Sequence, residues 1–235
     1  MVGIILCGAD EAGRGAILGP LVVSIVAVRS SSVKRLSEIG VRDSKLLSGK
    51  RRSWLYHEIK DIAAEIKIKC ITPKEINEAM TNHISLNELE AKHLSGLFDQ
   101  MESEASSIYL DSPDVIPERF GVRFGMYSTK KTRVKGVKTK IWDIKGSTRV
   151  IAEHKADSRY PVVSAASIIA KVTRDEEIAR LTKRLRIKIG SGYPSDATTI
   201  NAIRDHIKDE RFSEHIRDRW STMERIKQHS MGDYL

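Results

Sequence analysis

The sequence predicts a mixed fold, α/β or α+β, whose C-terminal part is helical. Two apolar runs rich in β-branched residues, at residues 3–9 and 21–28, lie on either side of a glycine-dense turn. Amphipathic helical spacing dominates after residue 160. Strands early in the chain and helices late in it favour a sheet covered by helices, and 235 residues are enough for one large core.

The first two strands are expected to pair as an antiparallel hairpin across the turn of residues 10–20. Ser48 is typical of a helix N-cap, and the apolar spacing after it predicts a helix with Trp54 and Ile66 on its apolar face. Residues 66–71 alternate between apolar and lysine side chains, which predicts a third strand with one solvent-facing side.

The second half of the chain is expected to contain more helix than strand. Pro73 is typical of the first turn of a short helix, and Ser85 begins a capping-box pattern before another helix. Residues 107–111 and 150–152 are expected strands, and residues 161–186 are an expected long helix. Two amphipathic helices then follow, with apolar positions at Ile200, Ile203 and Ile207 in one and at Ile216, Trp220, Met223 and Ile226 in the other.

Composition excludes several classes of protein. Cys7 and Cys70 are the only cysteines, so a disulfide scaffold is excluded and a reducing cytoplasm is favoured. The longest apolar run, residues 21–28, is too short to span a bilayer, and two acids interrupt the first apolar stretch where a signal peptide would need to be apolar. We therefore expect a cytoplasmic protein with no membrane partner, and we also expect it to be a monomer.

The net charge of +9 is concentrated in one basic segment, residues 119–149, which holds ten lysines and arginines but one acid. A polyanion is the natural partner of such a segment, and a solvated charged loop is the alternative. Glycines and apolar alternation within this segment predict a hairpin. The alternating residues are Val134, Val137, Ile141 and Ile144.

Acidic residues stand at the ends of several predicted elements. Asp10 and Glu11 end the first strand, Asp111 ends a later strand, and Asp157 comes just before the long helix. Adjacent strand residues point to opposite faces, so the break at Gly13 is expected to let the first two acids converge. Clustered carboxylates repel one another, and hard cations such as Mg²⁺ relieve that repulsion. The alternative is that each acid is a turn residue or a helix cap.

The glycines of residues 13–19 do not fit a nucleotide-binding motif. The dinucleotide fingerprint requires a helix after its glycines, whereas Pro20 and a β-branched run follow here. No Gly-Lys-Ser/Thr sequence closes a P-loop either.

Several ordered blocks resemble the ribonuclease HII family. Asp-Glu-Ala-Gly-Arg-Gly at residues 10–15, followed by Gly19-Pro20, resembles its opening signature. Later blocks resemble its D-S-K element, its acidic strand, its H-K-A-D block and its tyrosine motif. They are Asp43-Ser44-Lys45, Tyr109-Leu110-Asp111, residues 154–157 with 163–172 and 174–175, and Gly192-Tyr193-Pro194. The amino-acid sequence of residues 154–167 is most similar to that of the archaeal branch of the family.

The resemblance implies a fold and an activity. The fold is the RNase H fold, a central mixed five-stranded sheet with flanking helices, as a catalytic domain of residues 1–190 with a basic insertion near 119–149. Residues 191–235 are expected to form a helical region that holds substrate. The implied activity is endonucleolytic cleavage of RNA in RNA–DNA hybrids and at ribonucleotides embedded in duplex DNA. Two Mg²⁺ or Mn²⁺ ions would assist it, leaving 5′-phosphate and 3′-hydroxyl ends.

The same resemblance assigns site residues. Asp10, Glu11, Asp111 and Asp157 match the four metal-binding carboxylates of the family. The motif Gly13-Arg14-Gly15 matches its reader of the ribose 2′-hydroxyl, and Tyr193 matches its sensor of the RNA–DNA junction. Lys45 and Lys171 are expected to face phosphates.

Three other interpretations remain open beside this one. Ribonuclease HIII carries an extra N-terminal domain, which we do not expect because the first acid is already residue 10. A non-catalytic hybrid-binding module would lack one of the four acids. A structural metal protein would not need the Gly13–Gly15 motif.

The sequence departs from the family pattern in one place. The stretch of residues 112–148 is longer than the family pattern leads us to expect.

The last eight residues have the spacing Q-x-x-M-x-x-Y-L. This spacing resembles the peptide by which replication and repair enzymes dock on the sliding clamp, proliferating cell nuclear antigen. Clamp binding is therefore expected, and the alternative is that the tail folds back on the last helix. The residues concerned are Gln228, Met231, Tyr234 and Leu235.

Overall fold

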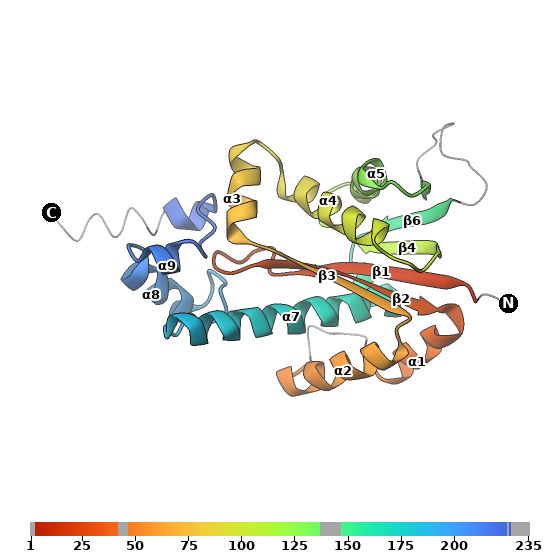
Figure 1. Ribbon diagram of the computed structural model, residues 1–235, viewed down its shortest axis with the longest axis horizontal. Helices are drawn as coiled ribbons and strands as arrows, with labels where there is room; N and C mark the ends of the chain where they lie inside the picture. The colour runs from red at the N-terminus through yellow and green to blue at the C-terminus, as the bar shows by residue number, and fades with distance from the viewer. Residues whose placement is uncertain (1–2, 42–46, 137–146, 225, 227–235) are drawn as a thin grey trace. The chain divides into compact units, whose positions relative to one another are not determined.

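The computed structural model describes residues 3–41, 47–136, 147–224 and 226. Within them, six strands form a sheet in the order β3-β2-β1-β4-β6-β5 (Figure 1). The strands are β1 Ile5–Ala12, β2 Leu21–Arg29, β3 Glu65–Ile71, β4 Ala105–Asp111, β5 Thr132–Val134 and β6 Thr148–Glu153. The helices are α1 Val33–Glu38, α2 Gly49–Ile62, α3 Pro73–Thr81, α4 Leu86–Asp99, α5 Pro117–Tyr127, α6 Ala156–Arg159, α7 Pro161–Leu185, α8 Ala197–His206 and α9 Glu210–Ser213.

The centre of the sheet is built from parallel pairs. Strand β4 runs parallel to both β1 and β6, and β5 runs parallel to β6. The register places Ala9 opposite Leu110 and Asp111 opposite Glu153. Because parallel strands end on the same side, the C-terminal ends of β1, β4 and β6 lie next to one another.

The chain forms two compact units. The first contains residues 1–11, 23–69 and 87–172, and the second contains residues 12–22, 70–86 and 173–235. Helix α7 contributes its N-terminal part to the first unit and its C-terminal part to the second. The division into a catalytic domain of residues 1–190 and a substrate-holding region of residues 191–235 stays a prediction.

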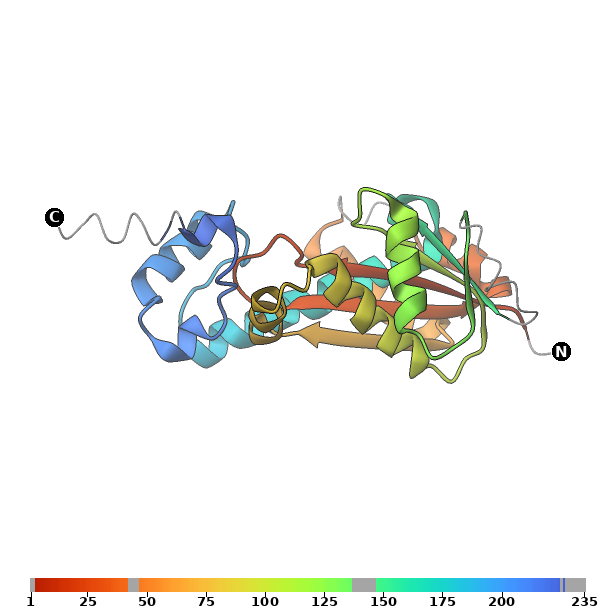
Figure 2. The same cartoon turned by 90° about the horizontal axis from the view of Figure 1, so that it is seen from above.

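Helices cover both faces of the sheet in the first unit. Helices α1, α2 and the start of α7 lie on one face, and α4 and α5 lie on the other (Figures 1 and 2). On the first face, strand β2 supplies the sheet side of a buried apolar cluster. Helices α1, α2 and α7 contribute Leu36, Leu55 and Ile169, respectively, to the same cluster. On the second face, the rings of Phe98 and Phe124 join α4 to α5, with centroids 5.5 Å apart.

A glycine lets α7 lie directly against strand β1. A Cβ atom on Gly8 would stand 2.2 Å from the backbone carbon of Val162, a distance that no side chain allows. On the neighbouring strand, the Ser24 hydroxyl donates to the Ala166 carbonyl at 2.8 Å. The start of α7, and the residues just before it, are thereby fixed close to the strand that carries Asp10.

The helix caps confirm the predicted starts of two helices. The Ser48 side chain accepts from the N–H of Arg51, and Thr72 with Glu75 forms a complete capping box before Pro73. The predicted position of Ile66 on the helix that Ser48 caps is wrong, because that helix, α2, ends at Ile62 and Ile66 belongs to β3 instead.

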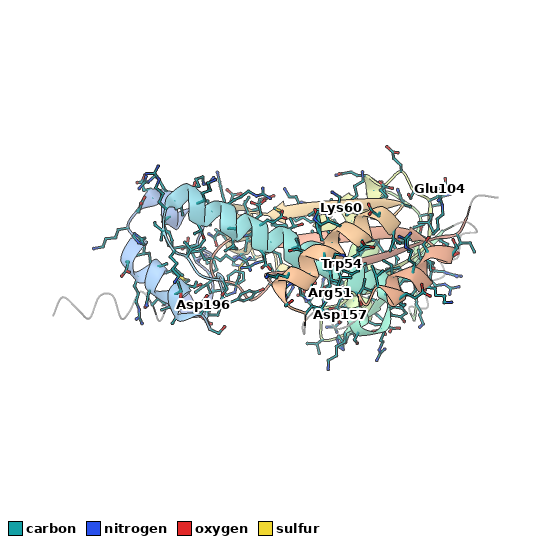
Figure 3. All side chains as sticks on the ribbon, turned by 90° about the horizontal axis from the view of Figure 1, so that it is seen from below. Arg51, Trp54, Lys60, Glu104, Asp157 and Asp196 are labelled. Carbon is teal, nitrogen blue, oxygen red and sulfur yellow. The ribbon has the colours of Figure 1, made fainter. Side chains whose placement is uncertain are left out.

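Trp54 is exposed and does not pack into the core as the apolar spacing suggested. The residue is 42% exposed and projects from α2 (Figure 3). The Arg51 guanidinium lies 4.0 Å from the ring centroid, so a cation–π contact covers one face of the ring.

The basic segment contains a helix that the sequence pattern did not predict. Helix α5 buries Phe120 and Phe124, an i,i+4 pair, while Arg119 is exposed and the half-buried Arg123 pairs with Asp114 and Glu88. Residues 132–134 form β5, which runs parallel to β6 and adds a sixth strand to the expected five, and the predicted hairpin stays a prediction. The other alternating residues, Val137, Ile141 and Ile144, lie outside the described residues.

The second unit has its own apolar core. Buried side chains from the turn after β1, the C-terminal part of α7, α8 and α9 pack together, with Leu18, Ile203 and Phe212 among them. The last predicted helix starts later than expected, because Ile216 forms a β-bridge with Leu18 and the chain is helical only at 221–224 and 226. Among the described residues, no helix has both the length and the apolar character that crossing a membrane requires.

Candidate active site

Three carboxylates meet in the first unit. Asp10 lies near the end of β1, Asp111 ends the neighbouring strand β4, and Asp157 is the second residue of α6. One carboxylate oxygen of each lies within 4.8 Å of the corresponding oxygens of the other two. Asp10 and Asp157 are buried and Asp111 is half-buried. Acids at separate element ends therefore converge, as the sequence predicted.

Local backbone geometry brings Asp157 to this cluster. Lys155 adopts a left-handed conformation with φ 54° and ψ 38°, which turns the chain sharply between β6 and α6. The N–H of Ala156 then donates to Asp111 Oδ1 at 2.8 Å, and the Ser164 hydroxyl donates to the Asp157 carbonyl. A left-handed lysine costs about 1 kcal/mol, so this turn is held by its surroundings.

The Asp10 carboxyl is unfavourable as an anion in the absence of a cation. Burial, followed by the charges of Glu11 and Asp111, raises the pKa of Asp10 well above its usual range. The Ser167 hydroxyl donates to this carboxyl and opposes the shift, and Lys171 Nζ in turn donates to Ser167 Oγ at 2.8 Å. Lys171 therefore reaches the acidic cluster through Ser167, a residue that the sequence motifs did not single out.

Glu11 lies beside the cluster but is not part of the group of three. Strand β1 continues to Ala12, so the break that was expected to turn both acids to one point comes after both of them. The N–H of Glu11 donates to Asp10 Oδ1 at 2.7 Å, and the Glu11 charge acts on Asp10. A direct role of Glu11 as a ligand stays a prediction.

The donor set of the cluster fits a hard divalent cation. Its ligand atoms are carboxylate oxygens, which Mg²⁺ and Mn²⁺ prefer, and they lie close enough to share one ion. A cation would also remove the repulsion that raises the pKa of Asp10.

The second unit carries the predicted reader residues. Gly13 has a φ of +90°, which side chains rarely adopt, so the chain turns there directly after β1. Gly15 is exposed, and a Cβ atom on it would meet nothing within 4 Å. The backbone at Gly15 is therefore open to a close ligand, and the half-buried Arg14 stands between the two glycines.

Tyr193 lies on a guanidinium in the same unit. The Arg174 Cζ atom is 4.6 Å from the centroid of its ring, and Arg174 Nη2 donates to the Ser191 carbonyl at 3.0 Å. The nearby Asp196 caps α8 and also accepts from the N–H of Ser191 at 2.6 Å. Its label in Figure 3 marks this end of the second unit.

Replacement of Asp196 with alanine is expected to loosen the Tyr193 turn in a pH-dependent way. Hydrogen bonds from Ser191 and Thr198 lower the pKa of Asp196 to about 2. A carboxyl with a lowered pKa stabilises the fold above its unfolded pKa, and this stabilisation is lost as the pH falls toward the folded value. Asp196→Ala should lower the free energy of unfolding by about 1 kcal/mol at neutral pH, as loss of an N-cap does.

The measurement is chemical denaturation of both proteins across the pH range. The difference between them should shrink as the pH falls from about 5 toward about 2. A difference that stays constant over this range would contradict the role of the Asp196 charge.

Five of the predicted site residues lie outside the described part of the chain. They are Lys45, Gln228, Met231, Tyr234 and Leu235.

Comparison with known proteins identifies the family of this chain. The family model for ribonuclease HII matches residues 7–223. The chain belongs to the ribonuclease HII family. The ribonuclease HII of Pyrococcus horikoshii is 39% identical over 226 residues, which cover 95% of this chain and 93% of the relative.

Solved structures of ribonuclease HII relatives share the fold. The ribonuclease H2 of Pyrococcus horikoshii OT3 has a TM-score of 0.81 and 36% identity, covering 97% of this chain and 99% of that one. The RNase HII in a complex with PCNA from Archaeoglobus fulgidus has a TM-score of 0.77 and 36% identity, covering 93% of this chain and 96% of that one. The RNase H fold predicted from the sequence is confirmed, with six strands in the sheet of the described residues.

Membership of the ribonuclease HII family settles the class of enzyme. The family consists of metal-dependent endonucleases that cleave RNA in RNA–DNA hybrids, and this chain is a hydrolase of that class.

Ser167, which donates to Asp10, is a site residue that the sequence analysis did not identify. It lies in the predicted long helix, three residues after Ser164, and this helical spacing was the available signal for a polar position that faces inward.

Proposed function

We propose that this ribonuclease HII cleaves both RNA–DNA hybrids and single ribonucleotides embedded in duplex DNA, leaving 5′-phosphate and 3′-hydroxyl ends. The observation that carries the proposal is the convergence of Asp10, Asp111 and Asp157 within 4.8 Å. Glu11 completes the ligand set as a fourth carboxylate. Two divalent ions, Mg²⁺ or Mn²⁺, would activate a water molecule and stabilise the leaving 3′-oxygen.

The chain's own residues prepare this chemistry. Ser167 and Lys171 hold the Asp10 carboxyl in one orientation, and the Ala156 N–H holds that of Asp111. These contacts fix the ligand oxygens before the metal arrives, which lowers the reorganisation that catalysis requires. Lys171 and Lys45 are further candidates for phosphate contacts.

The residues of the second unit supply substrate choice. The open backbone at Gly15 and the Arg14 side chain would recognise the ribose 2′-hydroxyl, the group that distinguishes RNA from DNA. Tyr193 would stack on the sugar or base beside that ribose, with Arg174 behind its ring.

The test is a cleavage assay with three labelled duplexes in Mg²⁺. The substrates are an RNA–DNA hybrid, a DNA duplex with one ribonucleotide, and plain DNA. We expect cleavage of the first two and none of the third, with products that a DNA ligase rejoins because they carry 5′-phosphate and 3′-hydroxyl ends. Cleavage of plain DNA, or an intact single-ribonucleotide duplex, would contradict the proposal.

The exposed cations of the basic segment are expected to contribute to duplex binding. Lys131, Arg133 and Lys135 are exposed on and beside β5, whereas Lys130 donates to the Met101 carbonyl and is part of the fold. Changing the three exposed cations to glutamine should reduce the slope of log K against log salt by about 0.9 for each phosphate that the variant no longer neutralises. Fluorescence anisotropy of a labelled duplex at several salt concentrations measures the slope.

The matched control changes two exposed cations of α1, Lys34→Gln and Arg35→Gln. The control should leave the slope as it is in the unmodified protein. An unchanged slope in the triple variant would identify the segment as a solvated surface.

We also propose that the C-terminal tail docks on a sliding clamp. The Archaeoglobus fulgidus relative has been solved as a complex with PCNA. Met231, Tyr234 and Leu235 would form an apolar plug, and Gln228 would supply an amide. A peptide of residues 226–235 should bind the clamp of the source organism, and Tyr234→Ala should weaken binding about 30-fold, as loss of an aromatic anchor does.

Calorimetry with the clamp measures the peptide and then the full chain. Ser230→Ala serves as the control, because position 230 falls between the motif positions. Equal clamp affinity of the full chain and of a chain ending at residue 227 would contradict the proposal.

We further propose that the protein is cytoplasmic and monomeric. The two free cysteines are consistent with a reducing compartment such as the cytoplasm.

A further inference from the structure

One buried arginine holds the turn that carries Arg14. Arg217 is fully buried, and its Nη1 donates to the carbonyls of Gly13 at 2.8 Å and of Arg14 at 3.1 Å. Its Nε donates to the carbonyl of Gly19 at 3.1 Å, and its own N–H donates to that of Ile17 at 2.9 Å. Residue 217 therefore binds both ends and the middle of residues 13–19, which we name the glycine loop.

A second buried arginine lies between the glycine loop and Tyr193. The Arg174 guanidinium packs on the Tyr193 ring and donates to the Ser191 carbonyl. A Cβ atom on Gly13 would stand 2.2 Å from Arg174 Nε, so this arginine is in direct contact with the turn. The Tyr193 ring, the Ser191 carbonyl and the backbone at Gly13 therefore hold Arg174 from three sides, although among the described residues its Nε has no hydrogen-bond partner.

The two segments are also joined through the backbone. The N–H groups of Ile17 and Leu18 both donate to the Gly192 carbonyl, at 2.9 and 3.1 Å. Gly192 directly precedes Tyr193. The reader of the 2′-hydroxyl and the junction sensor are therefore parts of one connected arrangement inside the second unit.

We propose that Arg217 and Arg174 are positioning residues that hold the glycine loop and Tyr193 in one arrangement and thereby set selectivity for a ribose. The inference rests on the proposed function of Arg14 and Tyr193. Arginine suits this role because its planar fork presents several donors in fixed directions, which matches three carbonyls converging on residue 217. A lysine has a single terminal nitrogen and cannot reach the same set with the same geometry.

The experiment uses the full-length enzyme and a double-mutant cycle. Arg217→Lys keeps the buried positive charge while losing the fork, and we expect kcat/KM on the single-ribonucleotide duplex to fall about 100-fold, the effect of a displacement of about 1 Å at a site. Arg14→Ala should cause a similar loss. The double variant should lose less than the product of the two single losses, since Arg217 acts through the loop that carries Arg14.

The control variant is Arg219→Lys, two residues away and exposed. It should leave both kcat/KM and the melting temperature unchanged. A general structural role of Arg217 predicts multiplied losses in the double variant, and that outcome would overturn the inference.

A second cycle keeps the test decisive if Arg217→Lys does not fold. Arg174→Lys removes the guanidinium from the Tyr193 ring, and its loss should not add to that of Tyr193→Ala. Mn²⁺ binding of every variant should match that of the unmodified enzyme, because the carboxylates belong to the first unit. If Arg14→Ala and Tyr193→Ala have no effect, the proposed function of the reader fails; if they have an effect and the arginine losses add to it, only the inference fails.

Discussion

Replacement of Asp10 with asparagine is expected to lower the rate of hybrid cleavage about 1000-fold or more while leaving the fold intact. Asp10 is the most buried member of the carboxylate cluster, and one of its oxygens lies within 4.8 Å of ligand atoms from Asp111 and Asp157. An amide keeps the shape of the side chain but removes the charge that attracts a cation. Several kcal/mol of charge stabilisation are at stake, and each 1.36 kcal/mol is a factor of ten in rate.

Stability should move in the other direction. Burial and the charges of Glu11 and Asp111 raise the pKa of Asp10, so its ionised form destabilises the metal-free fold at neutral pH. Asp10→Asn should therefore have a melting temperature, measured in a chelator, equal to or above that of the unmodified protein. A melting temperature that does not fall separates a lost ligand from a damaged fold.

The control for this prediction is Asp61→Asn. Asp61 is an exposed acid of α2 in the same unit, outside the carboxylate cluster. Its replacement should leave cleavage unchanged. Cleavage by Asp10→Asn at more than about a tenth of the normal rate in saturating Mg²⁺ would contradict the assignment.

Replacement of Tyr193 or Arg14 with alanine is expected to change substrate choice more than the rate on hybrids. A continuous hybrid offers a ribose at every position, whereas a single ribonucleotide offers one ribose and one junction. Stacking of one base on an aromatic ring contributes about 1–3 kcal/mol, so Tyr193→Ala should reduce kcat/KM on the single-ribonucleotide duplex about 10- to 100-fold. The loss on the hybrid should be several-fold smaller.

Tyr193→Phe is the matched control, because it keeps the ring over Arg174 and removes the hydroxyl alone. Near-normal selectivity of Tyr193→Phe would attribute the effect to stacking. Equal losses on both substrates for Tyr193→Ala and Arg14→Ala would argue against a junction-reading role.

The acidic cluster could be predicted from the sequence because strand ends are easy to locate. Asp111 ends a short apolar strand and Asp10 lies near the end of another, and parallel pairing of β1 with β4 brings them together. The approach of α7 to β1 depends on Gly8, whose missing side chain leaves room for Val162. Nothing in the spacing of Gly8 distinguishes it from any strand glycine, so this contact could not be predicted.

The structure of the basic segment was harder to predict, because its many basic residues obscured the helical spacing of its apolar residues. In α5 the buried Phe120 and Phe124 are spaced as on a helix face, but the arginines around them suggested a solvated segment. Strand β5 is three residues long, too short for alternation to reveal its pairing partner. Parallel pairing with β6 is a long-range property that local patterns do not carry.

The arginines behind the reader residues could not be identified from the sequence either. Arg174 lies in a long helix whose pattern predicts arginines on the solvent side, and Arg217 follows a short helix in a charged stretch. Their burial follows from the approach of the glycine loop, a segment about 200 positions away from Arg217. Tertiary contacts of this kind override the average preference of arginine for the surface.

The most direct test of the carboxylate cluster is calorimetric titration with Mn²⁺. The unmodified enzyme should bind Mn²⁺, and a variant with Asp10, Asp111 and Asp157 all changed to asparagine should not, although its melting temperature in a chelator stays the same or rises. Mn²⁺ binding of equal strength in both proteins would contradict the claim that these carboxylates hold the cation.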